Sequence, residues 1–163
     1  MKFRVPVTVI AFSAAAAMGL ALDEDYTDHA VIPVPGDVPT IGLGSTKGVK
    51  MGDKITPPQA FRRFITEIDK DYEGPLKRCL TVPVTQAEYD SLVRLAYNAG
   101  GGAVCREIVP LFNSAKTDED YVQACRAIKE WRITVKKKDC RIKANNCRGL
   151  VTRRAEESRL CEQ

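Results

Sequence analysis

The chain has a single histidine, His29, and none of its six cysteines stands in a Cys-x-x-Cys spacing. Structural zinc sites are built from close pairs of cysteine and histidine ligands, so no metal site is expected. There is also no internal repeat at solenoid periods, which excludes a repeat architecture. The 163 residues leave room for one compact domain beyond an N-terminal segment, and no cofactor is expected.

A net charge of +4 accompanies a concentration of arginine and lysine within residues 132–159. Such a basic stretch is either a solvated surface or a surface that attracts a polyanion: nucleic acid, acidic lipid or an anionic cell wall. No recognised nucleic-acid-binding motif accompanies it, so nucleic acid is not expected as a partner. We expect the protein to be a monomer.

An uncharged apolar run extends from Val5 to Leu22, after Lys2 and Arg4. Its eighteen residues would form a helix of about 27 Å, close to the bilayer core of about 30 Å. We therefore expect residues 1–22 to be a signal-anchor segment that also supplies the first helix of the folded domain, residues 23–163. A cleaved signal peptide, with Gly19-Leu20-Ala21 as the small-residue cleavage site, is the alternative.

Six cysteines follow this run, and an even number behind an export signal indicates disulfides formed in an oxidising compartment. Cys140 and Cys147 flank a short loop and are predicted to pair with each other. The remaining four are predicted to form two further bridges: Cys79, Cys105, Cys125 and Cys161.

Proline, glycine and β-branched residues alternate over residues 31–46, which predicts short strands joined by tight turns, one of them at Pro35-Gly36. Helices are predicted afterwards. The predicted starts are Thr56 with Pro57, the capping box Thr85-Gln86-Ala87-Glu88, Asp118 as a cap, and the residues after Gly149. An α+β domain follows, mostly helical with a small sheet near its N-terminus.

Glu24 is the candidate for acid catalysis. Hydrolysis of a glycosidic bond needs a carboxylic acid that stays protonated near neutral pH, together with a group that places water or stabilises the cationic transition state. Glu24 follows an apolar helix, and apolar surroundings raise the pKa of a carboxyl group. The alternative from the pattern alone is that Asp23-Glu24-Asp25 marks the end of a membrane segment.

Three ordered motifs resemble phage-type lysozymes, glycoside hydrolase family 24. Glu24 followed by residues 39–46 (PTIGLGST) resembles the active-site hairpin of that family. Residues 87–100 resemble its central helix, and residues 148–156 resemble its closing helix. The resemblance covers residues 20–161 and implies a lysozyme-like fold with the hairpin at the active-site cleft.

The family pattern places an Asp or Cys after the catalytic Glu and eight intervening residues, and here that position holds Pro33. Proline cannot act as an acid, base or nucleophile. Glu24 and Thr40 therefore carry over by motif position as catalytic residues. Asp37 is nominated as the second carboxylate because it lies on the same loop, and Asp28 is a weaker nominee.

The resemblance implies a bacteriolytic endolysin that hydrolyses the β-1,4 bond between N-acetylmuramic acid and N-acetylglucosamine in peptidoglycan. Gly42 and Asn98 are expected to contact substrate. The anchor resembles that of signal-anchor-release endolysins, which implies export to the periplasm with initial attachment to the inner membrane. Two alternatives remain: a lytic transglycosylase acting on the same bond, and an inactive membrane-anchored homologue that binds the wall.

Overall fold

A computed structural model describes residues 2–33, 36–135 and 137–163 of the chain. Pro35 of the predicted turn at Pro35-Gly36 lies outside these ranges. The basic residue Lys136 also lies outside them. The chain forms two compact units. The first comprises residues 1–12 and 72–163, and the second comprises residues 13–71.

The smaller unit begins with α1 (Ala14–Asp23), whose N-terminus is capped by the Ser13 side chain accepting the Ala16 N–H. The helix buries Ala17 and Leu20. It is ten residues long, so only the second half of the apolar run forms the helix that leads to Glu24. No helix within the described ranges combines the length and apolar character needed to cross a membrane.

Strands β1 (Tyr26–Val31) and β2 (Thr40–Leu43) follow α1 in the chain and pair antiparallel. Tyr26 faces Leu43 and Val31 faces Thr40, with an irregularity in the register between these pairs. The first strand starts earlier than the predicted region of residues 31–46, because the pairing partner across the ladder, not local composition, decides where a strand begins.

Helix α2 (Pro57–Glu67) follows the predicted start, with Thr56 at the N-cap in a capping box with Gln59. Phe64 is fully buried, but Phe61 and Ile65 are 43% and 37% exposed. The helical spacing of Phe61, Phe64 and Ile65 in the sequence predicts one apolar stripe, and this stripe is only partly a core face. The next segment, residues 68–73, is a π-helix, and this wider turn shifts the face that follows it.

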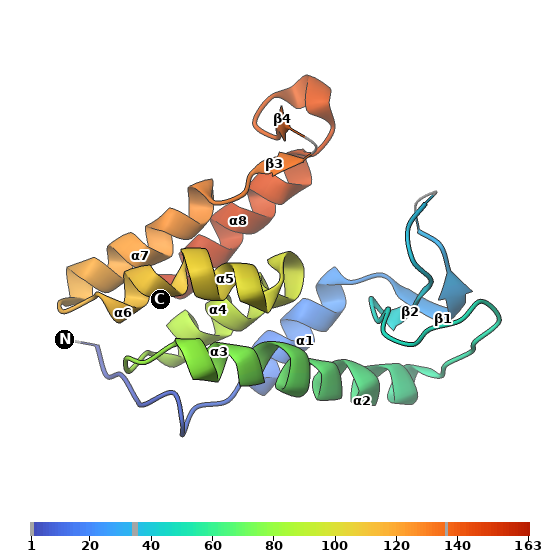
Figure 1. Cartoon of the computed structure of the whole chain (residues 1–163), viewed down its shortest axis with the longest axis horizontal. Coiled ribbons are helices and arrows are strands. Elements are labelled where there is room, and N and C mark those ends of the chain that lie inside the picture. Colours follow the sequence, from blue (N-terminus) through green and yellow to red (C-terminus); the bar gives the residue numbers. More distant parts are fainter. Residues whose placement is uncertain (1, 34–35, 136) are drawn as a thin grey trace. The chain divides into compact units, whose positions relative to one another are not determined.

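The larger unit is built from helices. Figure 1 shows α7 and α8 lying side by side, with the small β3–β4 hairpin projecting beyond their end. The helices of this unit are α3 (Gly74–Cys79), α4 (Gln86–Ala99), α5 (Gly101–Glu107), α6 (Val109–Asn113), α7 (Asp118–Glu130) and α8 (Arg148–Cys161). The hairpin strands are β3 (Thr134–Val135) and β4 (Lys138–Asp139).

The central helix of this unit is α4, which buries eight of its fourteen residues. The Thr85 side chain accepts the Glu88 N–H and the Glu88 carboxylate accepts the Thr85 N–H, so the predicted capping box is confirmed. Gly100 ends the helix at φ +89°, a backbone conformation that side chains disfavour. The cap of α7 is Thr117, one residue before the predicted Asp118.

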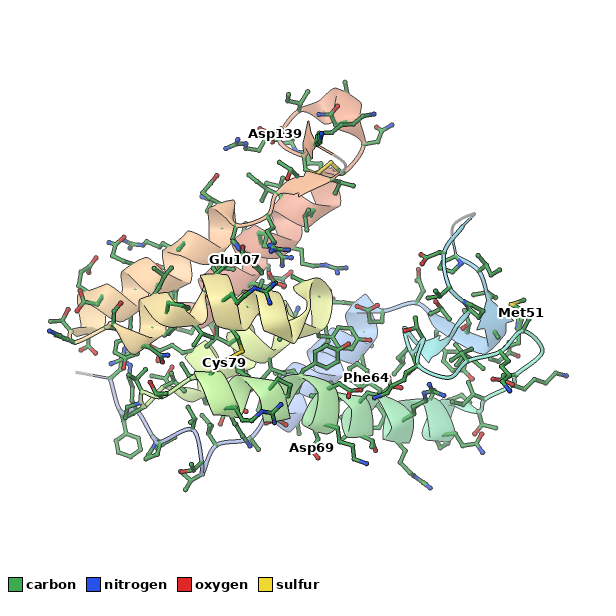
Figure 2. All side chains as sticks on the ribbon, viewed as in Figure 1. Met51, Phe64, Asp69, Cys79, Glu107 and Asp139 are labelled. Carbon is green, nitrogen blue, oxygen red and sulfur yellow. A yellow bond between two sulfur atoms is a disulfide. The ribbon has the colours of Figure 1, made fainter. Side chains whose placement is uncertain are left out.

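Three disulfides tie the larger unit together, and the predicted Cys140–Cys147 bridge is confirmed. The other two join Cys79 to Cys105, between α3 and α5, and Cys125 to Cys161, between α7 and α8. Figure 2 shows the bridge beside Asp139 closing the loop beyond β4. The short loop between Cys140 and Cys147 is therefore closed by a disulfide, as predicted.

Candidate active site

Glu24 lies at the junction of the helix and the sheet in the smaller unit. It is the C-cap of α1, with an extended backbone at φ −99° and ψ 136°, and its side chain is half-buried. Only Asp25 separates it from β1. A residue placed between a packed helix and a paired strand has little backbone freedom, so the carboxyl group of Glu24 is held by the fold and not by a loop.

Thr40 opens β2 in the same unit, opposite Val31. Its hydroxyl donates a 3.2 Å hydrogen bond to the Val38 carbonyl, and its oxygen keeps lone pairs that can accept a proton from water. Asp37 lies in the exposed connection between the strands, where its carboxylate accepts the Val38 N–H at 2.9 Å. The hairpin thus carries the two candidates for placing water within four residues of each other.

Asp28, the weaker nominee, is on β1 and pairs with His29, whose Nδ1 lies 2.5 Å from Asp28 Oδ1. The hydrogen bond with His29 lowers the pKa of Asp28 from its ordinary value. Its carboxylate is therefore favoured in the ionised form and is unsuited to donating a proton. Both side chains are largely exposed.

Gly42 is buried in β2 against α2, and its φ is +67°. A Cβ atom at this position would lie 3.0 Å from Cβ of Ala60. The glycine therefore allows the strand and the helix to approach closely. Contact of Gly42 with substrate stays a prediction, beside this packing role.

Ser45 and Glu67 form a contact that no pattern in the sequence indicates. The Ser45 hydroxyl, in a residue 3% exposed, donates a 2.6 Å hydrogen bond to Glu67 Oε2 at the end of α2. Arg63 donates to the other oxygen of the same carboxylate at 2.8 Å. These bonds tie the turn after β2 to α2 and so hold the hairpin of Thr40 in place. Only the spacing of Arg63 and Glu67, at i and i+4, was visible in the sequence.

Asn98, the other predicted substrate contact, belongs to the larger unit, near the end of α4. Its amide nitrogen donates to the Arg94 carbonyl at 3.0 Å and to Glu157 Oε1 at 3.1 Å, and its oxygen accepts from Arg153. The side chain is thus engaged within the protein on both its donor and acceptor atoms. Its placement relative to substrate stays a prediction.

The carboxylate that Asn98 contacts belongs to a buried ion pair. Glu157 and Arg154 are 0% and 2% exposed at their side chains and lie one helical turn apart on α8. Burial raises the pKa of Glu157, although the positive charge of Arg154 opposes this shift.

Arg154 also lies over the Trp131 ring, at 5.7 Å from its centroid. The Trp131 Nε1–H donates a 2.8 Å hydrogen bond to Glu107. The Trp131 ring therefore contacts the guanidinium groups of Arg132 and Arg154 with its face and a carboxylate with its edge.

Sequence comparison matches residues 23–157 of the chain to the family described as phage lysozyme. The chain is 32% identical over 149 residues to the SAR-endolysin of Pseudomonas phage phiKMV. This alignment covers 91% of this chain and 86% of that protein. It is 35% identical over 154 residues to a probable prophage lysozyme of Escherichia coli strain K12, with coverage of 91% and 84%.

The fold is similar to two solved structures. The endolysin from Escherichia coli O157:H7 phage FAHEc1 superposes with a TM-score of 0.75 at 28% identity, covering 98% of this chain and 96% of that one. The active form of the P1 phage endolysin Lyz gives a TM-score of 0.72 at 17% identity, with coverage of 99% and 96%, and shows the fold alone. The predicted fold class, α+β and mostly helical with a small sheet, is confirmed.

Proposed function

Because the chain belongs to the phage lysozyme family and is a bacteriolytic endolysin, a muramidase-type glycoside hydrolase of peptidoglycan, we propose that Glu24 is its general acid. The bond cleaved is the β-1,4 bond between N-acetylmuramic acid and N-acetylglucosamine. The observation that carries this proposal is the position of Glu24, half-buried at the end of α1 and one residue before the strand that pairs with β2.

In this mechanism the Glu24 carboxyl group donates its proton to the glycosidic oxygen as the bond to the anomeric carbon breaks. General acid catalysis typically contributes about 10²–10⁴-fold to the rate. The sugar left behind carries positive charge at the anomeric carbon, and water must attack it. The hydroxyl of Thr40 orients that water, and the Asp37 carboxylate on the same hairpin stabilises the positive charge and takes the proton that the water loses as its oxygen bonds to the anomeric carbon.

The test of Glu24 compares two substitutions of neighbouring acids. Glu24→Gln keeps the size of the side chain and removes its proton, and we expect no detectable turbidity loss of permeabilised Gram-negative cells. Asp25→Asn removes an exposed charge next to it and is expected to retain near wild-type lysis. Substantial lysis by the Glu24→Gln variant would remove Glu24 from the role of acid.

The second step is tested by the sugar ends of the digest. Hydrolysis leaves a reducing N-acetylmuramic acid, whereas a transglycosylase that uses one acid leaves an anhydro end. We expect reducing ends by mass spectrometry, and their loss in Asp37→Asn together with Thr40→Ala. Anhydro ends from the unchanged enzyme would favour the lytic transglycosylase. No product from the unchanged enzyme would favour a wall-binding homologue.

We also propose that the run from Val5 to Leu22 first anchors the chain in the inner membrane, with the remainder in the periplasm, and later folds into the enzyme. The length and lack of charge of the run support this proposal, as does the name SAR-endolysin carried by relatives that match most of the chain. Alanine and glycine within the run lower the free energy gained in lipid and pack closely in a protein.

The exposed faces of the run offer a clean test. Ala11, Ala14 and Ala15 are exposed, so leucine at these positions raises the hydrophobicity of the segment without filling the core. We expect the triple leucine variant to remain in the membrane fraction and to delay lysis. As a control, the purified variant should lyse permeabilised cells at the wild-type rate. Unchanged timing and unchanged fractionation would contradict the anchor.

A further inference from the structure

Residues 2–12 do not continue α1 but form a non-helical strap, with a turn at residues 7–9, on the larger unit. Val5 and Val84 exchange backbone hydrogen bonds of 2.9 and 3.0 Å. At the other end of the strap, the Phe12 N–H donates to Glu73 Oε1 at 3.0 Å. Val7 and Ile10 are 8% and 5% exposed and belong to the core. The strap is therefore an integral part of the larger unit.

Arg4 connects the strap to the larger unit through several side-chain hydrogen bonds. Its Nε lies 3.2 and 3.0 Å from the two oxygens of Glu88, and its Nη2 lies 2.7 Å from Glu88 Oε1. Its Nη1 donates to Asp118. The Arg4 Cζ atom lies 3.6 Å from the centroid of the Tyr121 ring, and the Tyr121 hydroxyl donates a 2.9 Å hydrogen bond to the Pro83 carbonyl. Two carboxylates and an aromatic face thus enclose one guanidinium.

Glu88 needs this cation. Its side chain is 2% exposed, and a buried carboxylate without a partner is strongly destabilising. It also accepts the Thr85 N–H at the start of α4, so its placement affects the central helix of the unit. Among the described residues, Arg4 supplies the positive charge paired with Glu88. The cation comes from a residue 84 positions before the carboxylate that it compensates.

We propose that Glu88, Asp118 and Tyr121 form a receptor site for the cationic amino terminus of the same chain, and that this site fills only after the apolar run has left the bilayer. The inference rests on the proposed anchor. While residues 5–22 span the membrane, Arg4 is held on the cytoplasmic side, where positive charge is retained. The bilayer core, about 30 Å thick, then separates its guanidinium from Glu88.

Arg4 consequently acts twice. Before release its positive charge, with that of Lys2, orients the anchor. After release the same guanidinium compensates the buried charge of Glu88 and locks residues 2–12 onto the larger unit. Withdrawal back into lipid would leave Glu88 buried and uncompensated, so docking of the strap makes release hard to reverse.

Two substitutions separate the roles in the membrane and in the receptor site. Arg4→Lys keeps the positive charge but loses the planar fork and the stack on Tyr121. Lys2→Gln removes a positive charge, while the backbone N–H of residue 2 still reaches Asp118. In the purified full chain we expect Arg4→Lys to lower Tm by about 2–4 °C and Lys2→Gln to lower it less. Equal Tm for Arg4→Lys and wild type would overturn the receptor site.

The second test asks when the site fills. In spheroplasts that hold the triple leucine variant of Ala11, Ala14 and Ala15 in the membrane, adding Arg4→Lys should leave the protease resistance of the larger unit unchanged. In released, soluble chain the same substitution should lower that resistance. A loss of resistance in both states would show that the site is occupied before release, and the proposal would be wrong.

The two proposals fail in distinguishable ways. If the leucine variant does not stay in the membrane fraction, the anchor proposal fails. In that case the Tm comparison still reports on Arg4, but the coupling between release and docking is excluded. If the anchor holds and the two states respond alike to Arg4→Lys, only the receptor site as a sensor of release is excluded.

Discussion

Gly42 and Ala60 approach so closely that a Cβ atom on Gly42 would lie 3.0 Å from Cβ of Ala60. Strand β2, which carries Thr40, therefore packs on α2 through backbone at this point. The position of the candidate catalytic hairpin depends on that approach, because a side chain at position 42 would require the strand or the helix to shift.

Gly42→Ala is expected to destabilise the smaller unit through both a positive φ of +67° and this contact. Gly48→Ala is the matched control, since its φ is +71° and no atom lies within 4 Å of its added Cβ. Chemical denaturation should show a loss of about 1–2 kcal/mol for the strained backbone in both variants. A further loss, with reduced lysis, is expected for Gly42→Ala alone. Equal losses would contradict the packing role.

Ser45→Ala should also loosen the hairpin, because the 2.6 Å bond to Glu67 is removed. A hydrogen bond to a charged group contributes about 1.5–3 kcal/mol. Urea denaturation measures the loss, and Ser114→Ala is a suitable control because its hydroxyl is exposed and bonds only within its own turn. An unchanged free energy of unfolding for Ser45→Ala would contradict a supporting role.

The three disulfides are expected to differ in their contribution. The bridge between Cys140 and Cys147 closes 7 residues, and the bridge between Cys125 and Cys161 closes 36. Chain entropy gives about 2 kcal/mol for the shorter loop and about 4 kcal/mol for the longer one. Paired replacement by alanine, followed by thermal denaturation, should lower Tm more for Cys125 and Cys161. The reverse order would show that the entropy of the unfolded chain is not the controlling term.

Glu107 is expected to remain ionised far into the acid range. Hydrogen bonds from Arg132 and Trp131 lower its pKa to about 2. A carboxyl group whose pKa falls on folding stabilises the folded state above its unfolded pKa of about 4.3, and this contribution is lost as the pH falls toward about 2. Carboxyl titration by NMR should show a rise in the pKa of Glu107 in Arg132→Gln. Arg126→Gln, which removes an exposed cation paired elsewhere, should leave it unchanged.

Much of the fold was predictable because the signals are local. The capping box of Thr85 and Glu88 forms its hydrogen bonds within three residues, so sequence spacing alone identifies it. The loop between Cys140 and Cys147 is short enough that pairing follows from proximity. The predicted stripe on α2 was wrong at Phe61 and Ile65, because burial depends on which elements pack against a helix and not on its own period.

The candidate site also contains residues that the sequence identifies and contacts that only the tertiary structure shows. Glu24 and Thr40 stand out in the sequence through their motif and hairpin. The bonds that hold the hairpin, from Ser45 to Glu67, join residues 22 positions apart and leave no pattern in the sequence. The family position of the second carboxylate holds Pro33, so no motif position identifies that carboxylate, and Asp37 is nominated only because it lies on the same loop as Thr40.

The sequence alone determined the starts of α2 and α4, the number of disulfides, the hairpin and the lysozyme family, because each depends on residues that lie close together or in a fixed order. The start of α8 differs from the prediction, since this helix begins at Arg148 and not after Gly149. Only the tertiary structure decided that the apolar run divides into a strap and a ten-residue helix, and that Arg4 pairs with Glu88. A buried carboxylate takes its cation from whichever segment the packing brings within reach, and here that segment lies 84 residues away.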